Sequence, residues 1–385
     1  MLRTERVSQC IFICSRVLCP ELTDVTLLSQ HSCRLCQSTE LELVLKLTPT
    51  VRKLNGNSAL RVRFVRDLDH VLIKFPAPPT TFYQPPANSF VPKEELEAHK
   101  ELFPLQVNFC KSCTHVQLSH VISPESLFRN YVYVSGTSPV MVQHLKAYAL
   151  EAAEFSSICE KDLVFEFGSN DGTLLQHFKD LGFPVLGMDP AKNLAEQATA
   201  AGLPTIPDFF SAQSARQVVA DHGKVRLICS NHCCAHIDDL RGVMQGVSEM
   251  LAPNGIWVFE VGYLLSVFQN SLFDTIYHEH VDFHTVEPIR RACESFGMRL
   301  LNASKNSIQG GSLRCFVGWP SDTPLIREGA HNVSELIREE LAAGLHKPAT
   351  FLRWVRNSIL PLNPSFVQFL TLPLFSYSHS LLQHS

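Results

Sequence analysis

Histidines, a tyrosine and two carboxylates gather within eight residues of this 385-residue chain. The run Tyr277-His278-Glu279-His280 is followed closely by Asp282 and His284. Imidazoles and carboxylates at such density can transfer protons near neutral pH or ligate a metal. The His-x-His spacing lacks the helical Glu-x-x-His match of many zinc enzymes, which argues against a metal. A polar surface loop is the alternative interpretation.

Two Cys-x-x-Cys pairs form a second candidate site. Cys33 with Cys36 and Cys110 with Cys113 offer four thiolates that can surround Zn²⁺ tetrahedrally. The chain has 13 cysteines, an odd number, and no clear secretion signal, so reduced thiols and metal ligation are favoured over a disulfide framework. The sequence therefore predicts one structural zinc ion. Four buried or unused cysteines are the alternative.

The two pairs lie unusually far apart, with 73 residues between Cys36 and Cys110. We interpret residues 48–84 as an insertion without consistent periodicity, and expect a loop or poorly packed segment there. The nearby His31 and His115 are expected to be surface residues.

A glycine turn after an apolar run forms a third candidate site. The run 163–167 predicts a buried strand, and a helical pattern starts at Thr173. Gly168 and Gly172 allow a sharp turn and a close backbone approach to a ligand. The spacing, Glu166-x-Gly-x-x-x-Gly, differs from Gly-x-Gly-x-x-Gly and disfavours a dinucleotide fingerprint. Ordinary loop chemistry would also explain such a turn.

The residue that ends the next predicted strand narrows the choice of ligand. Asp189 follows Gly172 by 17 residues, where an acid in a doubly wound fold accepts hydrogen bonds from ribose hydroxyls. Glu166 and Asp171 would repel a diphosphate, whereas they suit an adenosine that carries a sulfonium cation. The local charges therefore favour S-adenosylmethionine over NAD as the cofactor.

Alternating strands and helices must position these side chains. Strands are predicted over 163–167, 184–188, 204–206, 225–230 and 256–261, and helices over 139–158, 173–181, 191–201, 212–222 and 238–251. This alternation predicts an α/β, Rossmann-like fold with a largely parallel sheet, whose ligands bind beyond the carboxyl ends of the strands. Four stretches fall there: 168–172, Asp189, 231–236 (with Asn231) and 260–263. A further helix over 286–296 and strands over 298–303 and 312–317 would extend the sheet.

Composition and charge exclude several classes of function. The net charge of −4 comes without a basic block, so nucleic acid is not expected as a partner. No apolar run approaches 18 residues, so a membrane partner is not expected either. A hydrophobic content of 45% with 18% charged residues is typical of a globular protein. We expect a cytoplasmic monomer that acts on a small molecule.

Taken in order, these motifs resemble one known family. The order comprises Cys-Arg-x-Cys, Pro-Pro-Ala-Asn-Ser-Phe, Phe-Cys-x-x-Cys-x-x-x-Gln-Leu, Tyr-x-Tyr-x-Ser-Gly-Thr-Ser, Glu-x-Gly-Ser-Asn-Asp-Gly, Gly-x-Asp-Pro-Ala, Ala-His-Ile-x-Asp, Phe-Asp-Thr-Ile-Tyr-His-Glu-His and Gly-Gly-Ser-Leu-Arg. It resembles the zinc-containing, S-adenosylmethionine-dependent C-methyltransferases of nucleotide-linked deoxysugars. The resemblance covers residues 33 to 318.

The resemblance implies a domain organisation. Residues 33–138 would form a small amino-terminal zinc-binding domain, and residues 139–318 a Rossmann-like class I methyltransferase domain. Residues 1–32 are expected to be a poorly ordered extension. The family's carboxyl-terminal α/β domain would be only partial here, as a truncated region over 319–385 that ends in an irregular tail from Leu360.

The resemblance also implies roles for individual residues. Zinc would be bound by Cys33, Cys36, Cys110 and Cys113; the cofactor by Glu166, Gly168, Asn170, Asp171, Gly172, Asp189 and Asn231; and the acceptor site would contain His280 as general base with Tyr277, Glu279, His236 and Tyr131. The acceptor would be the carbon beside the ketone of a keto sugar. Methylation of oxygen or nitrogen in another small molecule, and a non-catalytic cofactor-binding remnant, remain as alternatives.

Overall fold

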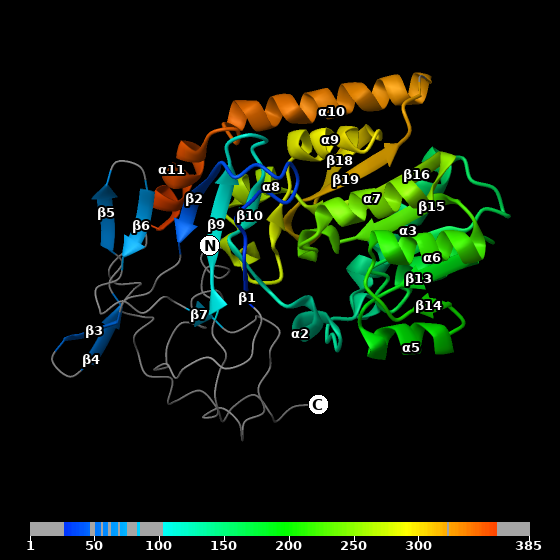
Figure 1. Cartoon of the computed structure of the whole chain (residues 1–385), viewed down its shortest axis with the longest axis horizontal. Coiled ribbons are helices and arrows are strands. Elements are labelled where there is room, and N and C mark those ends of the chain that lie inside the picture. Colours follow the sequence, from blue (N-terminus) through cyan, green and yellow to red (C-terminus); the bar gives the residue numbers. More distant parts are fainter. Residues whose placement is uncertain are drawn as a thin grey trace.

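The computed structural model describes residues 27–46, 51–54, 57–60, 63–67, 70–74, 83–84, 103–321 and 323–359. Within these residues, a seven-stranded sheet forms the larger half of the molecule and a six-stranded sheet forms the core of the smaller half (Figure 1).

The larger sheet has the strand order β14-β13-β12-β15-β16-β19-β18. The strands are β12 (Val164–Phe167), β13 (Val185–Met188), β14 (Thr205–Ile206), β15 (Val225–Asn231), β16 (Leu251–Gly262), β18 (Arg299–Asn306) and β19 (Ser312–Gly318). The pairs from β14 to β16 are parallel, whereas β19 runs antiparallel to both of its neighbours. The chain leaves β12 toward β14 and then returns to β15 on the other side, so a topological switch point lies between β12 and β15. The predicted α/β fold is confirmed.

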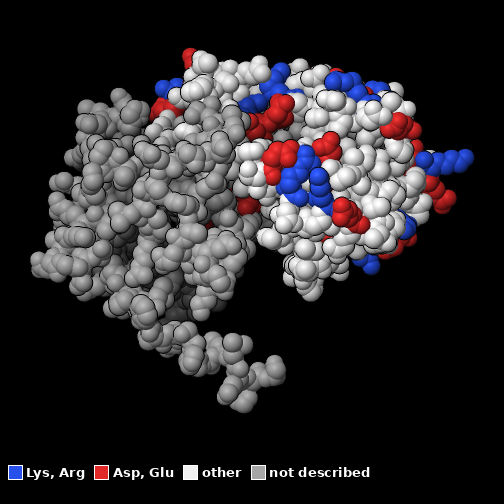
Figure 2. Space-filling model, turned by 60° about the horizontal axis from the view of Figure 1, so that its bottom comes forward, with Lys and Arg blue, Asp and Glu red and all other residues white. Residues whose placement is uncertain are grey.

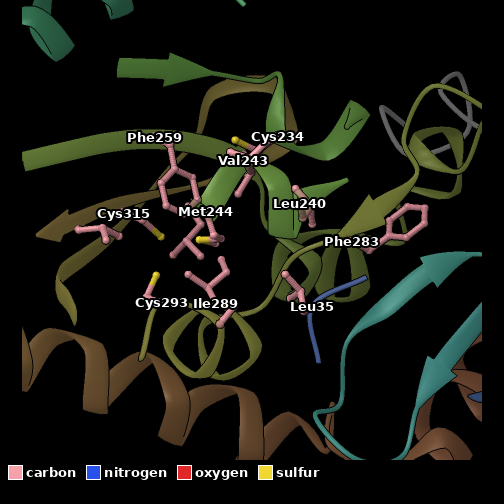
Figure 3. Packing of buried hydrophobic residues seen from close by; sticks show 14 of the residues in the cluster. Leu35, Cys234, Leu240, Val243, Met244, Phe259, Phe283, Ile289, Cys293 and Cys315 are labelled. Carbon is pink, nitrogen blue, oxygen red and sulfur yellow. The ribbon is translucent and has the colours of Figure 1, made fainter. Parts of the chain in front are cut away.

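Helices cover both faces of this sheet. They are α3 (Pro139–Ser156), α4 (Thr173–Asp180), α5 (Lys192–Ala200), α6 (Ala212–His222), α7 (Leu240–Met250) and α9 (Val286–Ser295). Alternating residues of β12 point to opposite faces: Val164 packs with buried residues of α3 and α4, whereas Phe165 and Phe167 join the cluster that contains α6 and α7. Figure 3 shows part of this second cluster, in which Met244 and Ile289 lie between Phe259 and Leu35.

The smaller sheet has the order β17-β10-β9-β2-β6-β5. Its strands are β2 (Leu41–Lys46), β5 (Arg63–Asp67), β6 (His70–Lys74), β9 (Gln106–Cys110), β10 (Val116–Leu118) and β17 (Asp282–Phe283). The edge strand β17 lies in sequence between β16 and β18 of the larger sheet, yet it pairs with β10 through Val116 and Gln117. Part of the histidine cluster, Asp282, therefore belongs to the sheet of the cysteine-containing domain.

Three expectations for the amino-terminal half differ from the structure. Strand β1 (Leu27–Ser29) pairs with β11 (His120–Ile122), so 27–32 is not a loose extension; residues 1–26 lie outside the described residues. The described parts of 48–84 form antiparallel pairs and not a loop: β3 (Val51–Leu54) with β4 (Asn57–Leu60), and β5 with β6. His115 was expected at the surface but is fully buried, and its Nε2 lies 2.6 Å from Asp282 Oδ1. His31 is exposed, as expected.

After β19 the chain forms two helices that pack back on the protein. Helix α10 (Pro324–Ala343) lies along β18, whereas α11 (Pro348–Ile359) contacts β2 (Figure 1). Residues 319–359 are thus largely helical, and the predicted irregular tail from Leu360 lies outside the described residues.

Glu340 of α10 forms a buried polar contact between this helix and the core. Its Oε1 accepts hydrogen bonds from the Tyr263 hydroxyl at 2.9 Å and from the Val286 amide at 2.7 Å. Burial raises the pKa of Glu340 to about 7, above that of an unfolded glutamate. Between the unfolded pKa of about 4.5 and the native pKa of about 7, the native state keeps a proton on Glu340 that the unfolded state has lost. The free energy of unfolding therefore decreases as the pH rises through this window.

We expect Glu340→Gln to weaken this pH dependence. Glutamine keeps the acceptor oxygen but cannot ionise, so the free energy of unfolding should fall less between pH 5 and pH 8 than in the wild type. The difference attributable to this residue should be at most about 3 kcal/mol. Urea unfolding at the two pH values measures it, with Glu328→Gln on the exposed side of α10 as the control. Identical pH dependence in Glu340→Gln and wild type would contradict the assignment.

No helix in the described part of the chain is long and apolar enough to span a bilayer. On the face shown in Figure 2, acidic and basic residues are interspersed over the described surface.

Candidate active site and zinc site

A cavity of about 640 Å³ opens beside the carboxyl ends of β12, β13 and β15. Its wall includes Tyr131, Glu166, Gly168, Asn170, Asp189, Asn231, His236, Tyr277 and His280 among the residues predicted from the sequence. The structure therefore brings most of the predicted cofactor and acceptor residues to one cavity at the switch point of the sheet. Asp171, Gly172 and Glu279 are not part of its wall.

The glycine turn after β12 requires its two glycines for packing reasons. Gly168 has φ +67°, and a Cβ atom there would lie 2.6 Å from the Cβ of Cys233. Gly172 has φ +79°, and its Cβ would lie 2.6 Å from Leu203 Cδ1, on the side away from the cavity. Gly168 therefore lets the turn line the cavity, whereas Gly172 lets α4 begin close to the segment after α5.

Asp189 ends β13 and ties the turn to it. Its Oδ2 accepts a hydrogen bond from the Asn170 amide at 2.8 Å, and Oδ1 accepts one from the Ala191 amide at 2.9 Å. Burial raises the pKa of this carboxyl although the two amides lower it. Each carboxylate oxygen retains a lone pair, so hydroxyl donors in the cavity can still bind.

Several buried polar atoms at the same end of the cavity have no partner among the described residues. They are Glu166 Oε2, Ser169 Oγ and both polar atoms of the Asn231 amide. Burial, followed by the charges of Asp189 and Asp171, raises the pKa of Glu166 well above its usual range. Buried polar groups are normally hydrogen-bonded. These unpaired donors and acceptors, beside Asp189, fit a nucleoside with hydroxyl, amine and carboxylate groups, as S-adenosylmethionine has.

A segment before α3 lies against the glycine turn. The Ser135 amide donates to Asn170 Oδ1 at 2.9 Å, and Asn170 Nδ2 donates to the Tyr133 carbonyl at 3.0 Å. The Gly136 amide donates to Asp171 Oδ2 at 3.0 Å. Asp171 thus fastens this segment over the turn and does not face the cavity itself.

His280 lines the same cavity, and its hydrogen bonds fix its tautomer. Nδ1 donates to the Thr275 carbonyl at 2.8 Å, because a carbonyl can only accept. The remaining lone pair on Nε2 accepts from the Tyr277 hydroxyl at 3.0 Å. Burial lowers the pKa of His280 to about 4, so the imidazole is neutral at pH 7. Such a group is free to accept a proton, although it is a weaker base than the sequence suggested.

Two further residues surround this imidazole. The His236 ring centroid lies 5.0 Å from that of His280, and burial lowers the pKa of His236 well below its usual range. The Tyr131 hydroxyl donates to Glu279 Oε2 at 2.9 Å. Glu279 is buried and does not line the cavity, whereas Tyr131 does. His278 points elsewhere, with Nε2 at 3.1 Å from the Phe103 carbonyl.

A buried charge network centred on Glu260 adjoins the cavity at His232 and was not predicted from the sequence. Glu260 Oε1 accepts from His144 Nε2 at 2.7 Å and from His232 Nε2 at 3.2 Å. Its Oε2 accepts from Arg314 Nε and Asn306 Nδ2, both at 2.9 Å. Although burial opposes it, these donors lower the pKa of Glu260 far below its usual range. The only local signal was an acid at the end of a predicted strand.

The four predicted zinc ligands converge. All four Sγ atoms lie within 4.8 Å of one another, with Cys33 and Cys113 at 3.5 Å and Cys36 and Cys110 at 3.6 Å. Sulfur atoms bound tetrahedrally at 2.3 Å from Zn²⁺ would lie about 3.8 Å apart. The thiols therefore fit a closed, structural zinc site, even though strands separate the two pairs in sequence.

Comparisons with known proteins match both halves of the molecule. Residues 144–303 match the family described as "Methyltransferase domain", and residues 82–128, which contain the second cysteine pair, match the one described as "Putative zinc binding domain". The C-methyltransferase NovU of Streptomyces niveus is 36% identical over 261 residues, which are 68% of this chain and 61% of NovU. The chain thus spans less than two thirds of that relative.

Solved structures give weaker similarities. A S-adenosylmethionine-dependent methyltransferase from Clostridium acetobutylicum has 13% identity and a TM-score of 0.38, covering 47% of this chain and 92% of that one. Magnesium protoporphyrin IX methyltransferase from Synechocystis has 12% identity and a TM-score of 0.38, covering 46% and 83%. The description of the fold rests on the strand order and pairing given above.

Proposed function

We propose that the chain is a zinc-containing, S-adenosylmethionine-dependent C-methyltransferase that methylates a carbon beside a ketone, and its similarity to the two families and to NovU supports this proposal. The acceptor is a nucleotide-linked keto sugar, and His280 is the general base. The observation that carries this proposal is the neutral His280 imidazole, which lies in the same cavity as Glu166 and Asp189 with its Nε2 lone pair directed to a mobile hydroxyl hydrogen.

A carbon acceptor explains why the site needs a base. Carbon is a poor nucleophile until a proton leaves, and a neighbouring ketone delocalises the resulting charge onto oxygen. In this proposal His280 Nε2 accepts that proton. The Thr275 carbonyl stays hydrogen-bonded to Nδ1 and stabilises the imidazolium. The Tyr277 hydroxyl, which now donates to Nε2, turns to donate to the enolate oxygen.

Because His280 is a weak base, the reaction depends strongly on the donors that stabilise the enolate oxygen. Because burial lowers the pKa of His280 to about 4, proton removal from carbon depends on strong binding of the developing oxyanion. Tyr277 and His236 both line the cavity beside His280, and we assign them as the hydrogen-bond donors to the developing oxyanion. Tyr131, held by Glu279, orients the sugar.

The residues of the cavity wall around Asp189 suit the methyl donor. S-adenosylmethionine supplies an electrophilic methyl group on a sulfonium. Asp189 accepts from the ribose hydroxyls, and Asn231 and Ser169 have free hydrogen-bonding capacity for polar groups of the cofactor. Burial raises the pKa of Glu166, and a bound sulfonium cation beside this carboxyl would lower it again.

The direct test uses cofactor with a labelled methyl group and a 4-keto nucleotide sugar. NMR should locate the label on the carbon next to the ketone. Label on oxygen or nitrogen would replace this proposal with that of an O- or N-methyltransferase. Cofactor binding without turnover on any keto sugar would favour a non-catalytic remnant.

Asp189→Ala should weaken S-adenosylmethionine binding, because charge-assisted hydrogen bonds to the ribose are lost. The expected cost is about 1.5–3 kcal/mol, measured by calorimetry. Since Asp189 also binds the amides of Asn170 and Ala191, Asp189→Asn serves as a shape-preserving second variant. Asp180→Ala, on the exposed end of α4, is the matched control. Unchanged affinity in both Asp189 variants would place the cofactor elsewhere.

A further inference from the structure

Arg34 lies between two of the zinc-ligand cysteines, and its side chain is buried. A buried guanidinium is costly unless its donors are satisfied. Its Nε donates to Asp238 Oδ1 at 2.7 Å, and one terminal nitrogen donates to the carbonyls of Leu118 at 3.1 Å and Val281 at 3.2 Å. We call the segment Cys33–Cys36 the zinc knuckle. Its residue Arg34 thus contacts three separate segments of the chain.

Two of these partners belong to the segments that carry the cavity histidines. Asp238 lines the cavity and follows His236 by two residues, and Val281 directly follows His280. The two segments are themselves joined, because the Val281 amide donates to the Ala235 carbonyl at 2.8 Å. Arg34 therefore holds both histidine segments without lining the cavity itself.

We propose that Arg34 is a positioning residue that sets the spacing of His236 and His280 from the zinc knuckle. The inference rests on the proposed function, which makes these imidazoles work together on one acceptor. The planar guanidinium suits this role because Nε and one terminal nitrogen bind a carboxylate and two carbonyls at fixed angles, which an ammonium cannot do. The second terminal nitrogen has no partner among the described residues. Displacing catalytic groups by about 1 Å can cost roughly 100-fold in rate.

The knuckle can serve as a fixed base because it is anchored independently of Arg34. Leu35 is buried in the cluster that contains Leu240 and Ile289, and Figure 3 shows it beside Leu240 and Phe283. Arg241 of α7 donates to the Leu35 carbonyl at 3.1 Å. Arg241 crosses the same boundary, and it also contacts Ser295 and Phe296. Because the burial of Leu35 anchors the knuckle without Arg241, this residue provides a control for the loss of a guanidinium at the boundary.

The test compares Arg34→Met and Arg34→Lys with Arg241→Met in the full chain. For Arg34→Met we expect unchanged zinc content and cofactor affinity, a turnover number lowered about 10- to 100-fold, and little change in KM. Arg34→Lys should recover only part of this loss. Arg241→Met should stay within about threefold of wild type. Equal losses in the Arg34→Met and Arg241→Met variants, or none in Arg34→Met, would overturn the proposal.

A second readout does not depend on turnover. In protein labelled with ¹⁵N-histidine, the imidazole signals of His236 and His280 should shift in Arg34→Met but not in Arg241→Met, and the Val281 amide should exchange faster with solvent. Unchanged signals and exchange would refute the positioning role even if the wild type proves inactive on keto sugars. Inactivity of the wild type with the expected shifts would instead count against the proposed function alone.

Asp238→Asn addresses the case in which Arg34→Met fails to fold. It keeps the side-chain shape but removes the charge that Arg34 Nε binds. We expect a smaller loss of turnover in the same direction, with the same imidazole signals displaced. Normal signals in a folded Asp238→Asn protein would contradict the proposal.

Discussion

His280→Ala should reduce turnover by roughly 10²–10⁴ while leaving S-adenosylmethionine affinity nearly unchanged. The side chain lines the cavity, and its hydrogen bonds run to Thr275 and Tyr277, not to the glycine turn. Solvent-deuterium exchange at the acceptor carbon, run without methyl donor, isolates the proton-transfer step. Exchange at the wild-type rate in His280→Ala would show that another residue is the base, with His236 as the next candidate.

His278→Ala is the internal control for this experiment. The two histidines are separated by one residue, yet His278 hydrogen-bonds the Phe103 carbonyl of the smaller domain and does not line the cavity. Its loss should lower stability and leave the exchange rate of the folded protein near that of the wild type. A variant that loses exchange through unfolding is thereby separated from one that loses the base.

The pH profile gives an independent test of the same residue. Since burial holds the pKa of His280 at about 4, the imidazole stays unprotonated well below neutral pH. The acidic limb of kcat/KM that belongs to His280 should therefore fall near pH 4, and the rate should be nearly flat between pH 6 and pH 8 with respect to this group. A limb near pH 6.5 would show that the imidazole is more solvated in the working enzyme than in this structure.

The sheet and its helices were predictable because their signals are local. Strand β12 is a short apolar run buried on both faces, and the glycines and acids that follow it mark the end of a strand at a ligand site. The strands that line the cavity were therefore placed within a few residues. The convergence of Gly168, Asp189 and Asn231 followed from the topology, because parallel strands end at one edge.

What the sequence concealed depends on partners far away in the chain. His115 looked like a surface residue, but Asp282, 167 positions later, binds it in the interior. Glu260 and His144 are 116 residues apart and form a hydrogen bond. Strand β17 has only two residues and no periodicity to reveal it. The local sequence around a polar residue does not show whether the residue is buried with a distant partner or exposed to water.

Loss of the zinc ligands should have the largest effect on stability. The Cys110→Ser, Cys113→Ser double variant is expected to bind no zinc, whereas the wild type should contain one ion per chain by elemental analysis. Since a structural site contributes its binding free energy to folding, unfolding should become easier by about 4 kcal/mol or more. Chelation of the wild type should produce the same shift. Cys159→Ser, at an exposed thiol outside the cluster, is the control.

The pairing of the strands predicts that loss of zinc also destabilises strands outside the segments that carry the cysteines. Strand β9 ends at Cys110, and β10, which pairs with β9, also pairs with β17 directly after His280. Loss of zinc should therefore increase amide exchange in β17 before it affects β12 or β13, which lie in the other sheet. Uniform loss of protection in both sheets would show that the two domains unfold as one unit. Zinc that remains bound in the double variant would instead refute the four-cysteine site.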